Sequence, residues 1–454
     1  MACRAGTASR RHELAIWRHH RGVSRWRSPY DREILGLALP ALGALAAGPL
    51  YSLVDTAIVG HLGAKQLAAL ALAATVLAAV VELADFLSYG TTGQVARLHA
   101  AGAHLEAGEI SAQALWLALA AGAVALVVLA IGGGPLLSLI GAGAHVHARA
   151  HSYLDIAIWG VPAQLVALAG EGCMRGVGDL RTPLRILVIA NVANVVLEVV
   201  LVYGAHLGLT GSAVGTLVAQ LGMGFAFGRR MLAAPARSRR PSAALIRPLL
   251  RTGSHLTVRT AALLGAFTLA SALAARFGTA ALAAHQVAFQ LFLFLALVLD
   301  AIAIAGQILV ARLLGAGHAQ DAWRAAVRML WWSIAWGVGF GLVLAAASGA
   351  GPHAFSDNAR VLGDSHRVWL LLGLMQPLAA AVFALDGILI GAGDTRYLAW
   401  AMAAAIAVFV PLAFAAGDVA ALWLALNALI LARLVTLVPR FVRRRWAVVG
   451  ARTS

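Results

Sequence analysis

Asp55 is an ionisable side chain within a long apolar stretch of the chain, and Pro40 and Pro49 precede it in the same stretch. A carboxyl group that loses its hydration among apolar helices can bind and release a proton near neutral pH. Proline removes a backbone donor and bends a helix. We therefore predict ion coupling at Asp55 and helix bending at the two prolines. The alternative is a static Asp55 that bonds Thr56 or a neighbouring helix.

A second polar group lies on one face of a later apolar stretch. Asn191, Asn194 and Glu198 are spaced by three and four residues, which places them side by side on a helix. Two amides and a carboxylate are costly against lipid and useful against a cavity. A structural hydrogen-bond network between helices is the alternative. The residues predicted to line a substrate cavity are Asn191, Thr216, Gln220 and Arg259.

Other charged residues in the apolar stretches have less specific roles. Asp85 and Asp300 occupy equivalent positions of an internal repeat, which favours a structural role common to both halves, and the role of Glu82 stays open with theirs. Glu171 and Asp386 form another repeated pair near predicted helix ends and are interpreted as structural. Arg259 could be either a counter-ion within the second half or a substrate contact.

The composition defines the class of protein. The chain has 454 residues, 61% of them hydrophobic and 12% charged, with a mean hydropathy of +0.83. A soluble protein of this length needs more polar surface. Runs of about 20 apolar residues, the length that crosses a bilayer, recur along the chain. These features predict an all-α integral membrane protein and exclude a β-barrel, because no short alternating segments occur.

The apolar runs predict twelve transmembrane helices. Their expected limits are 33–58, 66–92, 112–131, 151–172, 184–203 and 211–228 in the first half, and 250–274, 280–305, 326–347, 367–389, 398–416 and 419–438 in the second.

The two halves repeat one another at a constant offset of 215 residues. Matched alanines would be expected by chance in so alanine-rich a chain, but matched glycine, proline, tryptophan and charged residues would not. The matches include Asp85 with Asp300, residues 96–98 with 311–313, Trp116 with Trp331, Pro162 with Pro377, and residues 176–179 with 391–394.

Six spans in each half bring both halves into the membrane from the same side. We therefore predict two parallel, pseudo-symmetric six-helix bundles, residues 31–230 and 247–440. Residues 231–246 are basic and contain proline, which is typical of a cytoplasmic linker. Residues 1–30 and 441–454 are predicted to be basic cytoplasmic tails, the first of them disordered. A membrane-surface anchor, or a start codon placed too far upstream, is the alternative for the first tail.

The basic residues lie on one side of the predicted helices. Of the 35 Lys and Arg residues, all but seven fall in the two tails and one set of loops. This asymmetry places both termini in the cytoplasm. The net charge of +16 is thus explained by topology, and no nucleic-acid partner is expected. The seven exceptions are Lys65, Arg149, Arg276, Arg360 and Arg367 in the opposite loops, and Arg259 and Arg433 within spans.

Several stretches resemble the multidrug and toxic compound extrusion (MATE) family, in particular its DinF-like branch. They are residues 53–63 (LVDTAIVGHLG), 91–93 (TTG), 172–183 (GCMRGVGDLRTP), 284–288 (AHQVA) and 385–396 (LDGILIGAGDTR). Their combination is specific, and the resemblance covers about residues 31–440.

The resemblance implies export of amphipathic, often cationic compounds in exchange for H⁺ or Na⁺, by alternating access of the two lobes. It points to Asp55 as the coupling residue, with Asn194 and Glu198 at the family's asparagine and aspartate positions and Thr216 beside them. Glutamate is one methylene longer than the family's aspartate. The sodium-site carboxylates of another branch are not reproduced, which favours H⁺. A monomer without cofactor or metal, in a bacterial inner membrane, is expected.

Two other functions fit parts of the sequence. A lipid-linked precursor flippase or polysaccharide exporter would need a wide cationic groove, whereas only Arg259 and Arg433 lie well inside the predicted spans. Residues 176–179 and 391–394 both have the GxGD pattern of intramembrane aspartyl proteases. Both aspartates fall in predicted cytoplasmic loops and are followed by arginine. They are better explained as turns whose aspartate caps or salt-links a helix end.

Overall fold

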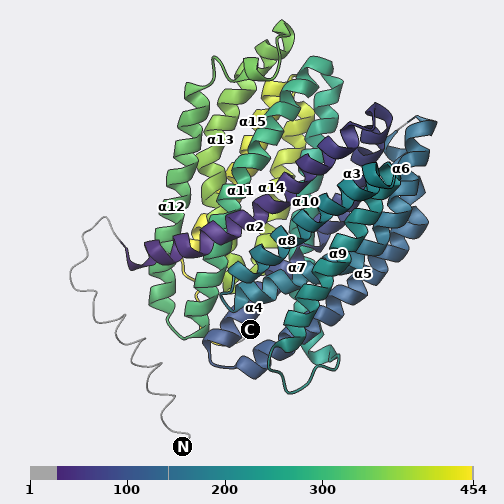
Figure 1. The fold of residues 1–454 in the computed structure, drawn as a ribbon. Coiled ribbons are helices and arrows are strands. Elements are labelled where there is room, and N and C mark those ends of the chain that lie inside the picture. The colour runs from purple at the N-terminus through teal and green to yellow at the C-terminus, as the bar shows by residue number, and fades with distance from the viewer. Residues whose placement is uncertain (1–27, 142, 452–454) are drawn as a thin grey trace, which may run out of the picture.

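The computed structural model describes residues 28–141 and 143–451. Twelve of its helical segments are long and apolar enough to cross a membrane. The chain is thus an all-α, multi-pass membrane protein, as predicted (Figure 1). The tail predicted to be disordered is residues 1–30, and its residues 1–27 lie outside the described part of the chain.

The first half of the chain forms a lobe of six spans, called the N-lobe. Three of these spans are divided into shorter elements. The N-lobe consists of α2 (Pro29–Gly60), α3 (Ala64–Ala84), α4 (Phe86–Ala100), α5 (His104–Ile140), α6 (Ala144–Ala157), η1 (Ile158–Gly160), α7 (Val161–Gly176), α8 (Arg181–Glu198), η2 (Val199–Gly204) and α9 (Leu209–Ala233).

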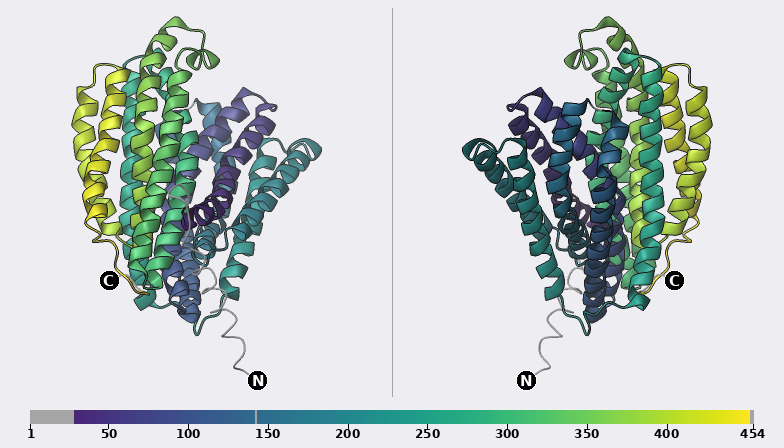
Figure 2. Two further views of the ribbon diagram at one scale, coloured as in Figure 1. Left: turned by 90° about the vertical axis from the view of Figure 1, so that its left-hand side faces the viewer. Right: turned by 90° about the vertical axis from the view of Figure 1, so that its right-hand side faces the viewer.

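The second half forms the C-lobe, also with six spans. It consists of α10 (Ala243–Arg276), α11 (Thr279–Gly315), α12 (Ala319–Ala346), α13 (Ala359–Ala392), α14 (Thr395–Ala415) and α15 (Val419–Val442), with a short 3-10 turn, η3 (Pro352–Ala354), before α13. The two lobes lie side by side (Figure 2).

The N-lobe helices break where their C-lobe counterparts continue. α3 and α4 are separated by a turn at Asp85, whereas α11 runs unbroken through Asp300. α6 and α7 are separated by η1 just before Pro162, whereas α13 continues through Pro377. Local breaks in a helix leave backbone groups free and give the chain points of bending. The two halves therefore follow the same path, but the N-lobe helices are broken where the C-lobe helices are continuous.

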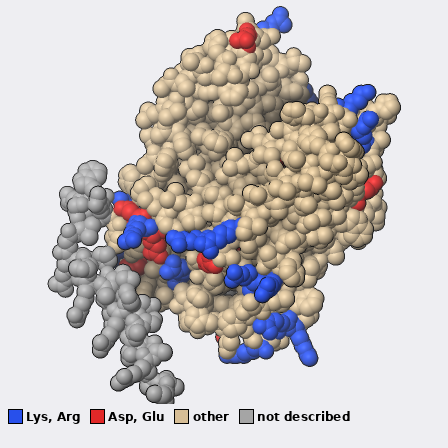
Figure 3. All heavy atoms as spheres, viewed as in Figure 1, with Lys and Arg blue, Asp and Glu red and all other residues tan. Residues whose placement is uncertain are grey.

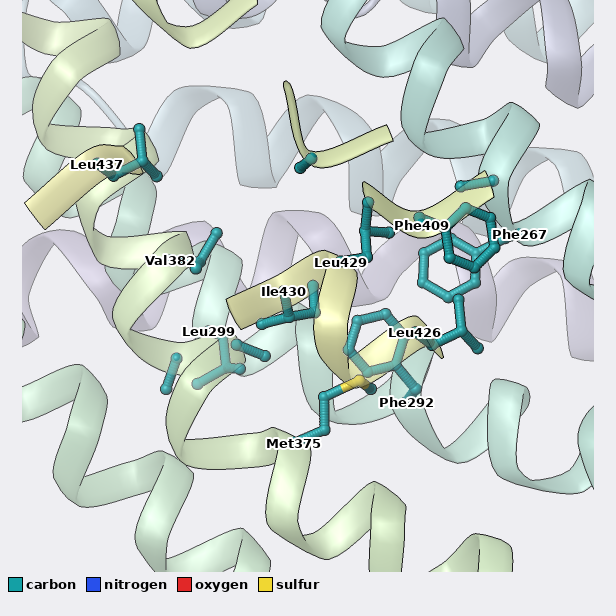
Figure 4. Packing of buried hydrophobic residues seen from close by; sticks show 14 of the residues in the cluster. Phe267, Phe292, Leu299, Met375, Val382, Phe409, Leu426, Leu429, Ile430 and Leu437 are labelled. Atoms are coloured by element: carbon teal, nitrogen blue, oxygen red, sulfur yellow. The ribbon is translucent and has the colours of Figure 1, made fainter. Parts of the chain in front are cut away.

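Each lobe has an apolar core of its own. In the C-lobe, Phe267, Phe292, Phe409 and Leu426 pack together, and the rings of Phe267 and Phe292 have centroids 5.5 Å apart (Figure 4). The N-lobe core contains Leu87, Leu129, Leu137 and Leu165. The apolar packing of the two lobes is thus separate.

The lobes pack together at the end of the molecule where α2 begins and α15 ends, which we call the terminal end. The first half of α2 contacts the C-lobe there. The apolar side chains buried in this contact include Ile34, Leu37 and Ala41 of α2, and Ala301, Ile304 and Ile308 of α11.

Ion pairs reinforce this packing. Asp31, which caps the start of α2 together with Ser28, pairs with Arg328 of α12 at 2.6 Å. Glu33 pairs with Arg312 of α11 at 3.0 Å. The N-terminal turn of α2 is thus held by the opposite lobe.

Away from the terminal end the lobes diverge (Figure 2). Hydrogen bonds between them reach as far as Thr257 Oγ1, which donates to the carbonyl oxygen of Leu83 at 3.4 Å near the middle of both spans. On the face shown in Figure 3, arginines gather in a band over the terminal end, and a broad surface without charged side chains lies above it. The molecule is therefore closed at the terminal end.

The connection between the lobes is shorter than the predicted linker 231–246, because α9 ends at Ala233 and α10 begins at Ala243. It is fixed to α5. The side chains of Gln113 and Trp116 donate to the carbonyl oxygens of Arg240 and Arg239 at 2.9 and 2.8 Å.

Candidate functional site

A group of polar side chains lies inside the N-lobe where α2, α8 and α9 meet. We call it the polar cluster. Its members are Tyr51 and Asp55 from α2, Asn194 and Glu198 from α8, and Ser212 and Thr216 from α9.

Glu198 is at the centre of the polar cluster and is fully buried. The hydroxyl groups of Tyr51 and Thr216 both donate to its carboxylate oxygen Oε1, the latter at 3.3 Å. The two hydroxyls are also 3.2 Å apart, and Asn194 Nδ2 donates to Thr216 at 3.5 Å. One carboxylate oxygen is therefore held by two helices of the lobe.

Asp55 lies beside Glu198, and the two carboxyl groups interact. Ser212 Oγ donates to Asp55 Oδ1 at 3.1 Å. Asp55 is 8% exposed, and within the described residues no cation pairs with either carboxyl. Two adjacent buried carboxyls without a cation favour a proton shared between them or a bound cation.

Two oxygens of the polar cluster have no hydrogen-bond partner among the described residues. They are Glu198 Oε2 and Asn194 Oδ1. Buried polar atoms are nearly always bonded, since an unpaired one costs about 1–3 kcal/mol. The cluster is thus able to accept a proton or a cation at these oxygens.

The local backbone brings α8 and α9 unusually close. A Cβ atom on Gly215 would lie 3.2 Å from Glu198 Cγ and 3.3 Å from Asn194 Oδ1, so a side chain there would press on both residues. Immediately after Glu198 the helix widens into the π-helical turn η2, a feature frequent at functional sites. This turn carries Tyr203, whose hydroxyl donates to the carbonyl oxygen of Ile58 at 2.6 Å.

Pro40 and Pro49 both lie inside α2, as expected. Asn191 lies near Pro49 and outside the polar cluster. Its Nδ2 donates to the carbonyl oxygen of Ala47 at 2.9 Å, two residues before Pro49. This bond ties the second half of α2 to α8.

Two other predicted cavity residues are placed elsewhere. Gln220 lies one turn beyond Thr216 on α9, and its side chain packs against the backbone of Gly160 in η1. Arg259 donates to Asp386 at 2.9 Å, and Arg433 pairs with the same carboxylate oxygen. Of the two roles considered for Arg259, the structure shows that of a counter-ion within the C-lobe.

The remaining carboxylates divide into paired and open groups. Glu171 pairs with Arg175 at 2.6 Å, and Asp300 accepts a hydrogen bond from Tyr89 at 2.9 Å across the lobes. Glu82 is exposed and Asp85 is half-buried beside the turn between α3 and α4. Neither residue belongs to the polar cluster.

Tyr51 and Ser212 also belong to the polar cluster, although the sequence did not identify them as site residues. A signal was present, because Tyr51 stands four residues before Asp55 and Ser212 four residues before Thr216, which puts each pair on one helix face. A tyrosine and a serine are common in membrane helices, so only the neighbouring helices identify their role.

The two GxGD turns behave as the sequence predicted. Asp179 accepts a hydrogen bond from the backbone N–H of Thr182, in the first turn of α8, at 3.0 Å. Asp394 pairs with Arg440 at 2.6 Å. Each aspartate thus has a structural partner at a helix end.

Comparisons with known proteins cover both lobes. The MatE family model matches residues 40–200 and 257–415. Protein DETOXIFICATION 44, a chloroplastic protein of Arabidopsis thaliana, is 32% identical over 391 residues, covering 82% of this chain and 74% of that protein. DNA damage-inducible protein F of Escherichia coli K12 is 29% identical over 440 residues, covering 92% of this chain and 93% of that protein.

Solved structures share the fold. A mutant of the Vibrio cholerae MATE transporter VcmN superposes with a TM-score of 0.82 at 17% identity, covering 92% of this chain and 98% of that one. A MATE protein crystallised in a bent conformation gives a TM-score of 0.81 at 18% identity, covering 91% and 94%. At these identities the likeness concerns the fold alone.

Proposed function

Because the chain belongs to the MATE family, whose members are efflux transporters of drugs and toxic compounds and not enzymes, we propose that it is a secondary active antiporter. It exports amphipathic or cationic small molecules in exchange for H⁺, and Na⁺ is the alternative coupling ion. We expect the protein to work without a cofactor and as a single chain, since the two lobes together can form a whole pathway.

One observation carries the proposal: α2 of the N-lobe is attached to both lobes. Its first half packs against α11 of the C-lobe, whereas its second half supplies Tyr51 and Asp55 to the polar cluster of the N-lobe. Pro49 lies between these two attachments, and Pro40 lies within the first of them. A change of charge at Asp55 can therefore alter how α2 is held and, through it, how the lobes sit.

The orientation follows from charge. Arginines gather at the terminal end, which we assign to the cytoplasm by the positive-inside rule (Figure 3). With this assignment, the closed end of the molecule faces the cytoplasm and the lobes diverge toward the outside, which is the arrangement of an outward-facing state (Figure 2). A bacterial inner membrane is the proposed location, in keeping with the E. coli relative.

The cycle begins in this outward-facing state, with the Asp55 carboxylate accepting a hydrogen bond from Ser212. A proton from outside neutralises Asp55 and weakens its hold on Ser212 and on a cationic substrate. The second half of α2 then shifts at its prolines, the substrate leaves outward, and the lobes rock. Asp55 finally releases its proton to the cytoplasm. The same carboxyl thus serves proton and substrate in turn, which is the basis of exchange.

The test is efflux of a fluorescent cationic dye from proteoliposomes with imposed pH gradients, with and without Na⁺. Wild-type protein and Asp55→Asn are compared, and Gln220→Ala serves as the control because Gln220 lies outside the polar cluster. We expect dye movement to follow the proton gradient, to vanish in Asp55→Asn and to persist in Gln220→Ala.

Uphill dye movement by Asp55→Asn under a proton gradient would contradict the role of Asp55. Movement that requires Na⁺ and survives the substitution would transfer coupling to other carboxylates. An absence of dye movement with every variant would favour the flippase or polysaccharide exporter.

A further inference from the structure

The segment that follows α15 folds back across the terminal end of the molecule. We call residues 443–451 the strap. From the end of α15 in the C-lobe the strap passes α11 and α12 and reaches α4 of the N-lobe. The sequence predicts only a basic tail here. The structure gives the strap defined partners in both lobes.

Trp446 anchors the strap to the C-lobe. It is 1% exposed, its ring stacks on Phe441 with centroids 5.8 Å apart, and its Nε1 donates to the carbonyl oxygen of Phe441 at 3.0 Å. Arg444 lies over the ring of Trp323 at 4.2 Å and donates to Gln320 at 3.1 Å. Arg444 also has a φ of 53°, a conformation that a non-glycine residue adopts only when its surroundings hold it there.

The far end of the strap is joined to both lobes. The N–H of Gly450 donates to the carbonyl oxygen of Leu314 in α11 at 3.0 Å. Arg97 Nη1, from α4 of the N-lobe, donates to the carbonyl oxygens of Val448 and Gly450 at 3.0 and 3.2 Å. Ala451 packs against the N-lobe core. The strap therefore crosses the boundary between the lobes.

Arg97 also bonds the C-lobe directly. Its Nη2 donates to the carbonyl oxygen of Ala392 at 2.7 Å and its Nε to that of Gly391 at 3.4 Å, both at the end of α13. The side chain is 1% exposed, and among the described ion pairs none contains it. Within the described part of the chain, its partners are all backbone carbonyls from the opposite half of the sequence.

A buried guanidinium held only by carbonyl oxygens makes a reversible lock. Its hydrogen bonds offset the loss of hydration while the lobes are together, and water replaces them when the lobes part. A carboxylate partner would leave an unpaired charge on each side after separation. The same arginine can thus seal the terminal end and release it at little cost.

We propose that the strap is a latch that holds the two lobes closed at the terminal end through Arg97, and that opening toward this end requires the strap to release Arg97. The proposal rests on the alternating access described above, but not on the identity of the coupling ion or on Asp55. The strap sets the balance between the two states and takes no part in substrate binding.

The test is a distance measurement across the closed end in the full chain. Spin labels are placed on Ala101 and Ala316, which are exposed, equivalent in the two lobes and identical in backbone conformation at φ −76° and ψ −1°. The native cysteines are first replaced. Wild-type protein is expected to show mainly the short distance of the closed state.

Gly450→Pro is the variant of choice. Gly450 has a φ of 131°, which proline cannot adopt, and proline also removes the N–H that bonds Leu314. The Trp446 anchor stays intact. With two hydrogen bonds to Arg97 lost, we expect the ratio of open to closed populations to rise about tenfold. Gly450→Ala keeps the N–H and should shift the ratio less, in the same direction.

Arg445→Gln is the matched control, because it removes a charge from the same segment at an exposed position. Its distances should equal those of the wild type. Unchanged distances in Gly450→Pro would overturn the latch, and so would equal shifts in Gly450→Pro and Arg445→Gln, which would show an effect of tail charge. Retained transport in Asp55→Asn would contradict the proposed coupling and leave this test unaffected.

Discussion

The polar cluster of the N-lobe and the corresponding region of the C-lobe lie on equivalent helices of the repeat but differ in chemistry. Each N-lobe position has a counterpart 215 residues later. Tyr51, Asp55, Asn194 and Glu198 correspond to Ala266, Ala270, Phe409 and Ala413, all four of which are buried in the apolar core of the C-lobe. Figure 4 shows Phe409 in this core.

Charge is also used differently in the two lobes. In the C-lobe, Asp386 is buried between Arg259 and Arg433, so each charge has an opposite partner. In the N-lobe, Asp55 and Glu198 lie side by side without a cation among the described residues. Paired buried charges hold a structure in one state, whereas unpaired ones invite a proton or an ion. The two lobes therefore share a helical framework, but among the described residues the N-lobe alone holds two adjacent buried carboxyls without a cation.

Removal of the central carboxylate of the C-lobe should have the largest effect on stability. Asp386→Ala leaves Arg259 and Arg433 buried without an anion, and we expect a loss of about 3–5 kcal/mol in the free energy of unfolding. Thermal unfolding in detergent measures it. The comparison is Asp55→Ala, which removes a carboxyl that accepts a hydrogen bond from Ser212 and lies beside Glu198, and which should cost about 1 kcal/mol or less. Equal losses in the two variants would remove the distinction between structural and functional charges.

Replacement of the buried N-lobe glutamate by its uncharged isostere should act on transport instead. Glu198→Gln keeps an oxygen that can accept from Tyr51 and Thr216 but removes the titratable group. We expect the initial rate of dye exchange to fall about tenfold or more, because the hydrogen bonds from Tyr51 and Thr216 are no longer made to a charged group. Its melting temperature should stay near that of the wild type. A normal rate with a lowered melting temperature would assign Glu198 to structure.

Loss of the hydroxyl that bridges the cluster should have a smaller effect on transport. Tyr51→Phe removes the donor to Glu198 and the contact with Thr216 while the ring remains. An interaction of about 1 kcal/mol corresponds to a three- to tenfold lower exchange rate. Tyr203→Phe is the control, because that hydroxyl bonds only the backbone of Ile58. Equal effects of both substitutions would mean that anchoring of α2, and not the hydroxyl bridge, limits the rate.

The sequence was sufficient for the fold because membranes restrict it. Length and hydropathy define spans, and identical residues at a constant offset define two lobes. Helix ends were less accessible: α2 begins at Pro29, four residues before its expected start, since the polar turn around Asp31 is capped by Ser28 and paired with Arg328. Such a turn is polar in sequence and helical only because a partner from the other lobe satisfies it.

The polar cluster was predictable in part for the same reason. Asp55, Asn194, Glu198 and Thr216 are polar in apolar surroundings, and the structure brings all four together. Spacing alone could not separate Asn191 from Asn194, because both lie on one helix face. Which of them meets Thr216 and which meets the backbone of α2 depends on the rotation of α8 against its neighbours. Contacts of this kind follow from packing between helices rather than from a pattern within one.

The two arginines at equivalent positions of the repeat, Arg97 and Arg312, provide a last comparison between the lobes. Both cross to the opposite lobe at the terminal end, but Arg97 is buried among backbone carbonyls, whereas the side chain of Arg312 is 42% exposed in its pair with Glu33. Exposed ion pairs contribute about 0.2–1 kcal/mol and are screened by salt. Arg312→Gln should therefore raise the open population about twofold at low salt, a change of roughly 0.4 kcal/mol.

The spin-label distance between positions 101 and 316 reports this change directly. At high salt the wild type and Arg312→Gln should converge, because screening already weakens the pair with Glu33. The hydrogen bonds of Arg97 are shielded from solvent, so Arg97→Gln should raise the open population at both salt concentrations. A salt-dependent effect of Arg97→Gln, or a salt-independent effect of Arg312→Gln, would show that solvent exposure of the side chain does not distinguish the two arginines. The asymmetry between the lobes would then be confined to the polar cluster of the N-lobe and the equivalent apolar region of the C-lobe.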